Sequence, residues 1–247
     1  SCPERRSASE LYLVIISNDF AAWACTGNLC GAIVPSLVIT DRAPLPSRIN
    51  MDSAQLHLAS SSPRRRSILR SLGIEFTQAG VCVDESHRPH EIITDIPMRL
   101  AMKKVRAVER KDSCQLPILA ADSLVIIGDQ LCGKPKSKDD ALSMLSKLSG
   151  RSHLVVTAVV LQVGEQIFSS KSSTEVRFRH ISEEEAKAYW RSGEPTGKAG
   201  AYAIQGIGGV FVESIRGSYS GVVGLPVFET ATLLINAGIQ ILHHQKL

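Results

Sequence analysis

The chain has few aromatic residues, and its charges nearly balance. Only 5% of its 247 residues are aromatic, and 28 basic against 24 acidic side chains leave a net charge of +4. Proteins that bind nucleic acids through a basic surface carry a larger positive excess, often with aromatic side chains that stack on bases. The composition therefore argues against nucleic acid as a partner, whereas a mild positive charge suits a small anionic ligand.

Cysteine motifs and membrane-spanning runs are also lacking. The six cysteines have neither C-x-x-C spacing nor the density of a disulfide scaffold, which predicts inert thiols in a reducing, cytoplasmic compartment. Between Leu11 and Thr40 the only charged residue is Asp19, but asparagine, threonine, glycine and proline interrupt the apolar residues. We therefore expect no membrane segment.

The first 50 residues differ from the rest. They contain no methionine, and Met51 stands directly before the first clear strand pattern. We expect an ordered domain over residues 51–247, for which 44% hydrophobic residues provide a sizeable core. Residues 1–50 then form a leader that is either an unstructured extension or sequence upstream of the natural start.

Strand and helix patterns alternate along the predicted domain. The strands are expected at residues 56–59, 75–77, 117–127, 152–162 and 166–178, with two short ones near Ala201 and Val210. The helices are expected at 63–72, 97–109, 138–148, from Ser182 to Gly193, and at 226–236. Helices interleaved with both crossover strands and a hairpin predict an α/β fold with a mixed, twisted sheet and flanking helices.

The segment Leu58-Ala-Ser-Ser-Ser-Pro-Arg-Arg-Arg66 joins a short strand to a helix. Its proline occupies the first helical position, so free backbone N–H groups follow at once. Hydroxyl and guanidinium donors surround them, and all of these groups attract an anion. The donors are Ser60, Ser62, Arg64 and Arg65. The segment is a candidate polyphosphate site, although helix capping and solvated arginines explain it equally well on its own.

Asp122 interrupts an otherwise apolar strand. Burying an uncompensated carboxylate costs several kcal/mol, and a position inside a strand is not explained by turn formation. A structural hydrogen bond is one explanation, but a cation or a catalytic role is favoured. Asp84 and Glu85 lie on a predicted loop and taken alone fit a solvated surface. Together with Asp122 they predict oxygen ligands for Mg²⁺.

Two lysines are further candidates. Gly128–Lys134 nearly matches a Walker A motif, but Pro135 has no hydroxyl for a metal ion, so we reject a P-loop. Lys134 follows a tight turn after the strand that holds Asp122, from which it can reach the same phosphate. Lys104 lies on a predicted helix with an inward apolar face. For both lysines a solvated position is the alternative.

Glycines cluster between residues 193 and 224, a pattern that hairpin geometry explains for most of them. Gln205 lies in a nearly apolar stretch of this segment. Its amide presents both a donor and an acceptor to the edge of a base.

These motifs resemble the Maf family of nucleotide pyrophosphatases, in order, over Leu56–Gly238. The matching segments are Leu58-Ala-Ser-x-Ser-Pro-Arg-Arg65, Asp84-Glu85, Leu100-Ala-x-x-Lys104, Ala120-Ala-Asp-Ser123, Gly133-Lys-Pro135, Leu148-Ser-Gly-Arg-x-His153, Ala199-Gly-Ala-Tyr-Ala-Ile-Gln-Gly206 and Gly217-Ser-Tyr-Ser-Gly-Val-Val-Gly-Leu-Pro226. The resemblance implies a two-lobed fold with a central cleft, a homodimer, and hydrolysis of nucleoside triphosphates to the monophosphate and pyrophosphate.

The resemblance also implies roles for individual residues. Asp122 corresponds to the catalytic base, and Glu85 with Asp122 holds the metal ion, for which Mg²⁺ is expected and Mn²⁺ and Co²⁺ are alternatives. Lys134 completes the predicted catalytic set. The predicted substrate-binding set is Ser60, Ser62, Arg64, Arg65, Lys104, Ser123 and Gln205, of which Arg64, Ser123 and Gln205 match the base-specificity positions.

Ala-Tyr-Ala-Ile-Gln resembles the subgroup that acts on dTTP and UTP rather than on 7-methyl-GTP, where Glu is typical at the Gln205 position. Two departures stand out: Ser123 replaces the usual Thr, and Gly197 stands where Asp is common. The second departure predicts weaker activity. A 7-methyl-GTP pyrophosphatase and a nucleotide-binding regulator of cell division with little turnover are the alternatives.

Overall fold

The computed structural model describes residues 54–86, 88–108 and 116–241. The predicted leader and the boundary at Met51 lie outside these residues and stay predictions. Among the described residues, none of the helices is long and apolar enough to cross a membrane.

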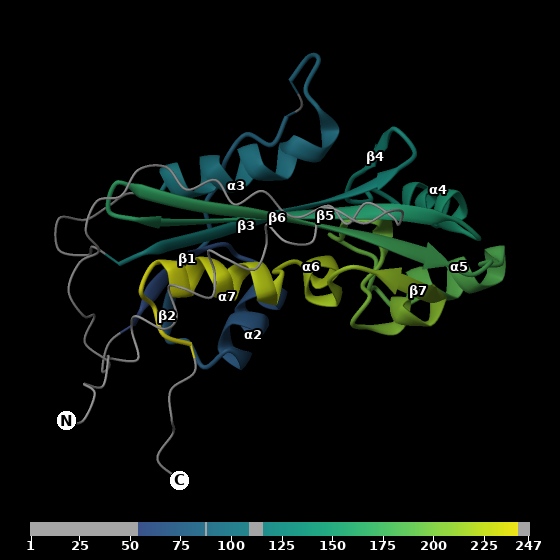
Figure 1. The fold of residues 1–247 in the computed structure, drawn as a ribbon. Helices are drawn as coiled ribbons and strands as arrows, with labels where there is room; N and C mark the ends of the chain where they lie inside the picture. Colours follow the sequence, from purple (N-terminus) through teal and green to yellow (C-terminus); the bar gives the residue numbers. More distant parts are fainter. Residues whose placement is uncertain (1–53, 87, 109–115, 242–247) are drawn as a thin grey trace, which may run out of the picture. The chain divides into compact units, whose positions relative to one another are not determined.

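A mixed seven-stranded sheet organises the described chain (Figure 1). Its strands are β1 (Leu56–Ala59), β2 (Phe76–Ala79), β3 (Ile118–Ile127), β4 (Gln130–Cys132), β5 (Ser152–Val163), β6 (Gln166–Phe178) and β7 (Val212–Arg216). The order is β2-β1-β3-β5-β6-β7, with β4 paired to β3. β1 is parallel to both β2 and β3, and the other pairs are antiparallel. The predicted α/β fold with a mixed sheet is confirmed.

Helices flank this sheet on both faces. They are α2 (Pro63–Ser71), α3 (Ile96–Arg106), α4 (Lys138–Leu148), α5 (Glu183–Arg191), α6 (Tyr219–Val223) and α7 (Val227–Asn236), with 3-10 turns η1 (Ile93–Asp95), η2 (Ala199–Ala201) and η3 (Ile207–Phe211). Figure 1 shows α3 on one face, with α2, α6 and α7 on the other. Helix α5 follows the expected start at Ser182, where a capping box forms: the side chains of Ser182 and Glu185 each accept the backbone N–H of the other.

The side-chain alternation along β3 divides the core. Leu119 and Ala121 pack in the cluster with α2 and α7, whereas Val125 packs in the cluster with α4 and α5. Ser123 lies between them on the same face, since alternate residues of a strand share a face. Asp122 lies on the opposite face with Ala120, which packs against α3. This division of one face into two clusters agrees with the predicted two-lobed arrangement.

One edge of β3 is open at its middle. β1 pairs with β3 only at Ile118 and Leu119, and β4 pairs only with residues 125–127. Residues 120–124 therefore have a strand partner on the β5 side alone. The opening lets groups from both faces of the sheet reach one space beside Asp122 and Ser123.

Several predicted elements are wrong in detail. The expected strand near Ala201 is the 3-10 turn η2, because Gly200 and Ala201 have φ of 73° and 57°, which no strand accommodates. Near Val210 the chain forms η3, and the strand starts only at Val212. The glycines of this segment therefore do not form a hairpin. The sequence patterns also missed β4 and α6, and α3 ends at Arg106 rather than at residue 109, which lies outside the described residues.

His153 is a buried, neutral member of the core. It is 3% exposed, its Nε2 lies 2.8 Å from the hydroxyl of Tyr202, and its ring packs edge-on against Phe178. Burial lowers the pKa of His153 to about 4. Between that value and its ordinary value of 6.5 the unfolded chain binds a proton that the folded chain excludes, so stability is lost as the pH falls through this window.

Acidification is therefore expected to cost this protein stability through His153. Between pH 7 and pH 5 this residue alone removes about 2 kcal/mol from the free energy of unfolding. Urea titrations at the two pH values, on the wild type and on His153→Gln, measure the contribution as the difference between their pH dependences. Equal pH dependence in both proteins would contradict the assignment.

Candidate active site

A cleft of about 560 Å³ occupies the open edge of β3. All residues of the predicted catalytic and substrate-binding sets line it: Ser60, Ser62, Arg64, Arg65, Glu85, Lys104, Asp122, Ser123, Lys134 and Gln205. They come from the β1–α2 loop, the first turn of α2, a loop before α3, α3 itself, β3, the segment after β4 and the segment after η2. The structure thus brings all of them together, while the roles assigned to them stay predictions. Asp84, which was also expected to be a metal ligand, does not line the cleft; its carboxylate is exposed and pairs with Lys103.

The serine loop begins α2 as the sequence predicts. Ser62 is its N-cap, with Oγ accepting the N–H of Arg65 at 3.5 Å. Ser60 is buried, and its Oγ accepts the N–H of Ser62 at 3.2 Å and the Nη1 of Arg65 at 3.3 Å. The capping interpretation is therefore confirmed for Ser62, and the anion-binding interpretation stays a prediction for these serines, which line the cleft.

Arg65 joins this loop to distant parts of the chain. Its Nε donates to the carbonyl of Gly224 at 2.8 Å and its Nη2 to Ser123 Oγ at 3.2 Å. Ser123 Oγ lies 2.9 Å from Thr157 Oγ1, which donates to the Gly221 carbonyl. The guanidinium is held in one orientation by partners on the loop, on β3 and after α6. Burial lowers the pKa of Arg65, and the charge of Asp122 opposes that effect.

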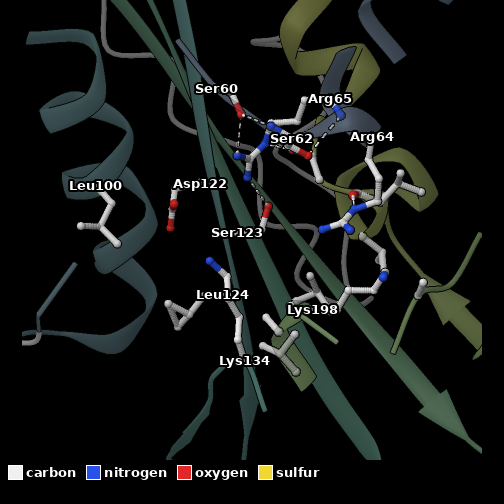
Figure 2. A pocket seen from close by; sticks show the side chains of 18 of the residues that line it. Ser60, Ser62, Arg64, Arg65, Leu100, Asp122, Ser123, Leu124, Lys134 and Lys198 are labelled. Carbon is white, nitrogen blue, oxygen red and sulfur yellow. Dashed lines mark hydrogen bonds between the residues drawn. The ribbon is translucent and has the colours of Figure 1, made fainter. Parts of the chain in front are cut away.

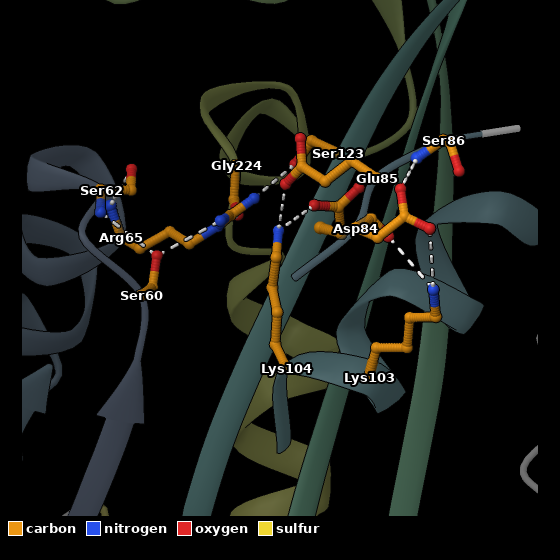
Figure 3. Close-up of polar contacts among 11 residues, drawn as sticks. Ser60, Ser62, Arg65, Asp84, Glu85, Ser86, Lys103, Lys104, Ser123 and Gly224 are labelled. Atoms are coloured by element: carbon orange, nitrogen blue, oxygen red, sulfur yellow. Dashed lines mark hydrogen bonds and ion pairs between the residues drawn. The ribbon is translucent and has the colours of Figure 1, made fainter. Parts of the chain in front are cut away.

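Two carboxylates converge on one ammonium group (Figure 3). Lys104 Nζ lies 2.5 Å from Asp122 Oδ1 and 3.1 Å from Glu85 Oε1. Asp122 is 8% exposed, and this burial raises its pKa although the charges of Lys104 and Arg65 act in the opposite direction. Burial also acts to raise the pKa of Glu85, but contact with Lys104 outweighs it, and the net pKa is lowered.

The loop that carries Glu85 is held by α3. Arg99 donates from Nη2 to the carbonyl of Ser86 at 3.1 Å and also pairs with Glu91. Lys103 donates to the carbonyl of Asp84 at 3.2 Å. Neither Arg99 nor Lys103 was predicted from the sequence, because each acts on backbone atoms of a loop more than ten residues away and leaves no local pattern.

The cleft has two chemically different ends. In Figure 2, Lys134 extends toward Asp122 on one side of Ser123, whereas Arg64 and Lys198 lie on the other. Arg64 donates from Nε to the carbonyl of Val223 at 3.2 Å. One end therefore combines carboxylates with ammonium groups, and the other is cationic (Figure 2).

The two carboxylates of the cleft can hold a divalent cation only if water or a bound phosphate supplies the remaining oxygen ligands. Among the described residues, no group of three or more His, Cys, Asp and Glu side chains gathers around one point. Asp122 and Glu85 nevertheless converge within contact of the same Lys104 nitrogen. Mg²⁺ commonly binds through one or two carboxylates, water and phosphate oxygens, so two carboxylates beside an anion site suffice.

Comparison with known proteins gives the family. The family model described as Maf-like protein matches residues 55–237. The chain belongs to the Maf family. The matched span contains all the predicted Maf segments that line the cleft, from the serine loop to Gln205.

Curated relatives of this Maf chain carry enzyme names. A dTTP/UTP pyrophosphatase of Hahella chejuensis is 47% identical over 194 residues, which cover 78% of this chain and 96% of the relative. A dTTP/UTP pyrophosphatase of Escherichia coli O157:H7 is 44% identical, with coverage of 73% and 92%. A nucleoside triphosphate pyrophosphatase of Haemophilus ducreyi is 42% identical, with coverage of 76% and 98%.

The departure from the Maf pattern at Gly197 lies on the cleft wall. Gly197 adopts φ of +71°, and a Cβ built there meets no atom within 4 Å. The neighbouring Lys198 donates from Nζ to the carbonyl of Glu194 at 2.6 Å, and burial lowers its pKa. A Cβ therefore has space at Gly197, but the positive φ would strain a residue with a side chain there. Weaker activity from this change stays a prediction.

Proposed function

We propose that this Maf chain hydrolyses nucleoside triphosphates to the monophosphate and pyrophosphate, with dTTP and UTP preferred. One observation carries the proposal: a single cleft combines an anion-binding loop and lysines with the buried carboxylate of Asp122. The names of the relatives support the same reaction, and the alignments with this chain cover nearly the full length of each relative. Homodimer formation and a cytoplasmic location, without nucleic-acid or membrane partners, stay predictions.

Asp122 acts on the attacking water. Its carboxylate accepts a proton as the water oxygen bonds to the α-phosphorus, and the bond from that phosphorus to the bridging oxygen breaks. Pyrophosphate leaves with the electrons of that bond. Burial raises the pKa of Asp122 and so makes it a better proton acceptor than an exposed aspartate, while the charges of Lys104 and Arg65 favour its ionised form.

The cationic groups bind the triphosphate. Arg65, Lys104 and Lys134 surround the same end of the cleft and offset the negative charge that develops on pyrophosphate, which is the main task in phosphoryl transfer. Glu85 and Asp122 would hold a divalent cation, Mg²⁺ being preferred to Mn²⁺ or Co²⁺, which supplies further charge neutralisation to the phosphates.

Gln205 recognises the base in this proposal, and Arg64 and Ser123, which line the same cleft, complete the base-specificity set. The Watson–Crick edge of uracil or thymine has an N–H donor flanked by carbonyl acceptors. A glutamine amide matches such an edge because it both donates and accepts.

Replacing Gln205 by Glu removes the donor and places a carboxylate against a carbonyl oxygen. We expect kcat/KM for dTTP and UTP to fall at least about tenfold, because a site built around a hydrogen bond rejects a mismatched partner strongly. Steady-state kinetics with dTTP, UTP and 7-methyl-GTP measure the change. Unaltered dTTP and UTP kinetics would remove Gln205 from base recognition.

The proposed function is tested by pyrophosphate release from a panel of dTTP, UTP, CTP, GTP, ATP and 7-methyl-GTP with Mg²⁺. Fastest release from dTTP and UTP is the expected result. Preference for 7-methyl-GTP would overturn the specificity. Binding of nucleotide without release would favour the nucleotide-binding regulator of cell division.

A further inference from the structure

Gln205 lies on a segment that has no strand or helix of its own. Residues 203–208 run from the end of η2 into η3, and Ala203 and Ile204 are buried whereas Gln205 is exposed in the cleft. Within the segment, Gly206 N–H donates to the carbonyl of Ala203 at 3.1 Å. The position of residues 203–208 must therefore be determined mainly by contacts with other parts of the chain.

Glu194 provides those contacts at one end of the segment. Its Oε2 accepts the N–H of Ile207 at 2.9 Å, and its Oε1 accepts the N–H of Gly208 at 2.9 Å. The hydroxyl of Tyr189 donates to the same Oε1 at 2.7 Å. Partial burial acts to raise the pKa of Glu194, but these donors outweigh it and the pKa is lowered, so the carboxylate is ionised at neutral pH.

Tyr189 extends the support to the other end of the segment. Its hydroxyl oxygen also accepts the N–H of Ala203 at 3.1 Å. Glu194 and Tyr189 together hold the backbone on both sides of Gln205, at Ala203 before it and at Ile207 and Gly208 after it. Both belong to α5 or to the turn that follows it, and neither lines the cleft.

The packing around these two side chains leaves little freedom. A Cβ at Gly206 would lie 2.1 Å from Glu194 Oε2, and one at Gly208 would lie 2.4 Å from the Tyr189 hydroxyl. Gly206 and Gly208, for which the sequence pattern indicated hairpin geometry, are therefore positions where the backbone lies in direct contact with the Glu194 carboxylate and the Tyr189 hydroxyl. Their absence of side chains is what allows the close hydrogen bonds.

We propose that Glu194 is a positioning residue for nucleobase recognition, acting through the backbone of residues 203–208 to hold the Gln205 amide against the base. The inference rests on the proposed function and extends it to a residue outside the cleft. Glu194 does not contact Asp122, Lys104 or Arg65, so the phosphate end of the cleft is left intact when Glu194 changes.

The test is Glu194→Gln, which keeps the side-chain length. The glutamine amide has only one oxygen, so its NH₂ group must take the place of one carboxylate oxygen. In one orientation the NH₂ group faces the Ile207 N–H; in the other it faces both the Gly208 N–H and the Tyr189 hydroxyl. In either orientation two donors face each other and a hydrogen bond to a charged acceptor is lost, at a cost sufficient for about a tenfold effect. We expect KM for dTTP to rise about tenfold, kcat to fall less than about threefold, and the preference for dTTP over dCTP in kcat/KM to fall about tenfold.

Glu185→Gln is the matched control. Glu185 lies in α5, the helix that carries Tyr189, and its carboxylate also accepts a backbone N–H, that of Ser182 at 2.9 Å. Its hydrogen bonds go to Ser182 and Arg179 and not to residues 203–208. We expect it to leave KM and the dTTP preference unchanged. Tyr189→Phe, which leaves the Ala203 N–H without this acceptor, is expected to shift both in the same direction as Glu194→Gln.

The outcomes separate the inference from the proposed function. Unchanged KM and base preference in both Glu194→Gln and Tyr189→Phe, or a fall in kcat alone, would overturn the inference. If Glu194→Gln does not fold, as judged by circular dichroism and thermal melting, Tyr189→Phe decides. If the wild type releases no pyrophosphate, the proposed function fails, and calorimetric binding of dTMP against dCMP to the same variants tests the positioning role.

Discussion

Asp122→Asn is expected to lower kcat for pyrophosphate release from dTTP by about 10²–10⁴-fold, the usual contribution of a positioned general base. Asparagine keeps the shape of the side chain but accepts no proton from the attacking water. Lys104 retains its contact with Glu85, so the cleft keeps a partner for this ammonium. Single-turnover and steady-state release of pyrophosphate measure the effect, and calorimetry measures binding of the nucleotide.

The control for this variant is Asp129→Asn. Asp129 lies in the exposed turn after the same strand and does not line the cleft. Its replacement is expected to leave kcat within about twofold, as a surface change does. If Asp122→Asn hydrolysed dTTP at a rate close to that of the wild type while binding it equally well, Asp122 would not be the base.

Arg65→Lys has the second-largest expected effect, a fall of about 10²-fold or more in kcat/KM, comparable to the loss of one donor to the transition state. A guanidinium donates in several fixed directions, here to Gly224, Ser60 and Ser123. A lysine ammonium is a point charge on a flexible stem and does not span these partners. The same positive charge therefore loses its fixed place beside the phosphates.

Arg66→Lys is the matched control for Arg65, because Arg66 is the next residue of α2 and is exposed. It is expected to leave kcat/KM within about twofold. Because both variants keep the positive charge, any difference between them reports on the geometry of the Arg65 guanidinium rather than on its charge. Equal kinetics of Arg65→Lys and the wild type would show that the fixed orientation of the guanidinium is unimportant for hydrolysis.

Local signals explain which elements the sequence predicted well. Helix α4 starts after the N-cap Ser137 and ends before Gly150 as expected, and α5 starts at its capping box. The β5–β6 hairpin turns at Gly164, whose φ of +58° only a glycine adopts without strain. In each case the residues that determine the boundary lie within a few positions of it.

The segment after α5 could not be predicted in the same way. Residues 199–211 were expected to contain strands, but the N–H groups of Ala203, Ile207 and Gly208 donate to the Tyr189 hydroxyl and the Glu194 carboxylate rather than to a neighbouring strand. Side chains from another element thus replace the strand pairing that the local pattern suggests. Short β4 was missed because three residues carry too little periodicity.

The candidate site likewise contains some residues that local sequence signals reveal and others that only the fold reveals. Asp122 and the serine loop stand out because a carboxylate in an apolar strand and a proline at a helix start are local anomalies. By contrast, the carbonyl partner of Arg65 is 159 residues away, and Arg99 holds a loop carbonyl 13 residues away. Nothing in a local window signals such contacts, so the residues that orient the site appear only in the fold.

The most direct test of the account is hydrolysis of dTTP by the full chain in ¹⁸O-labelled water with Mg²⁺. Attack on the α-phosphorus predicts pyrophosphate as the product and one ¹⁸O atom in dTMP. Label in pyrophosphate instead, or release of inorganic phosphate, would contradict the mechanism at its central step. Binding of dTTP without any product would contradict the enzyme itself.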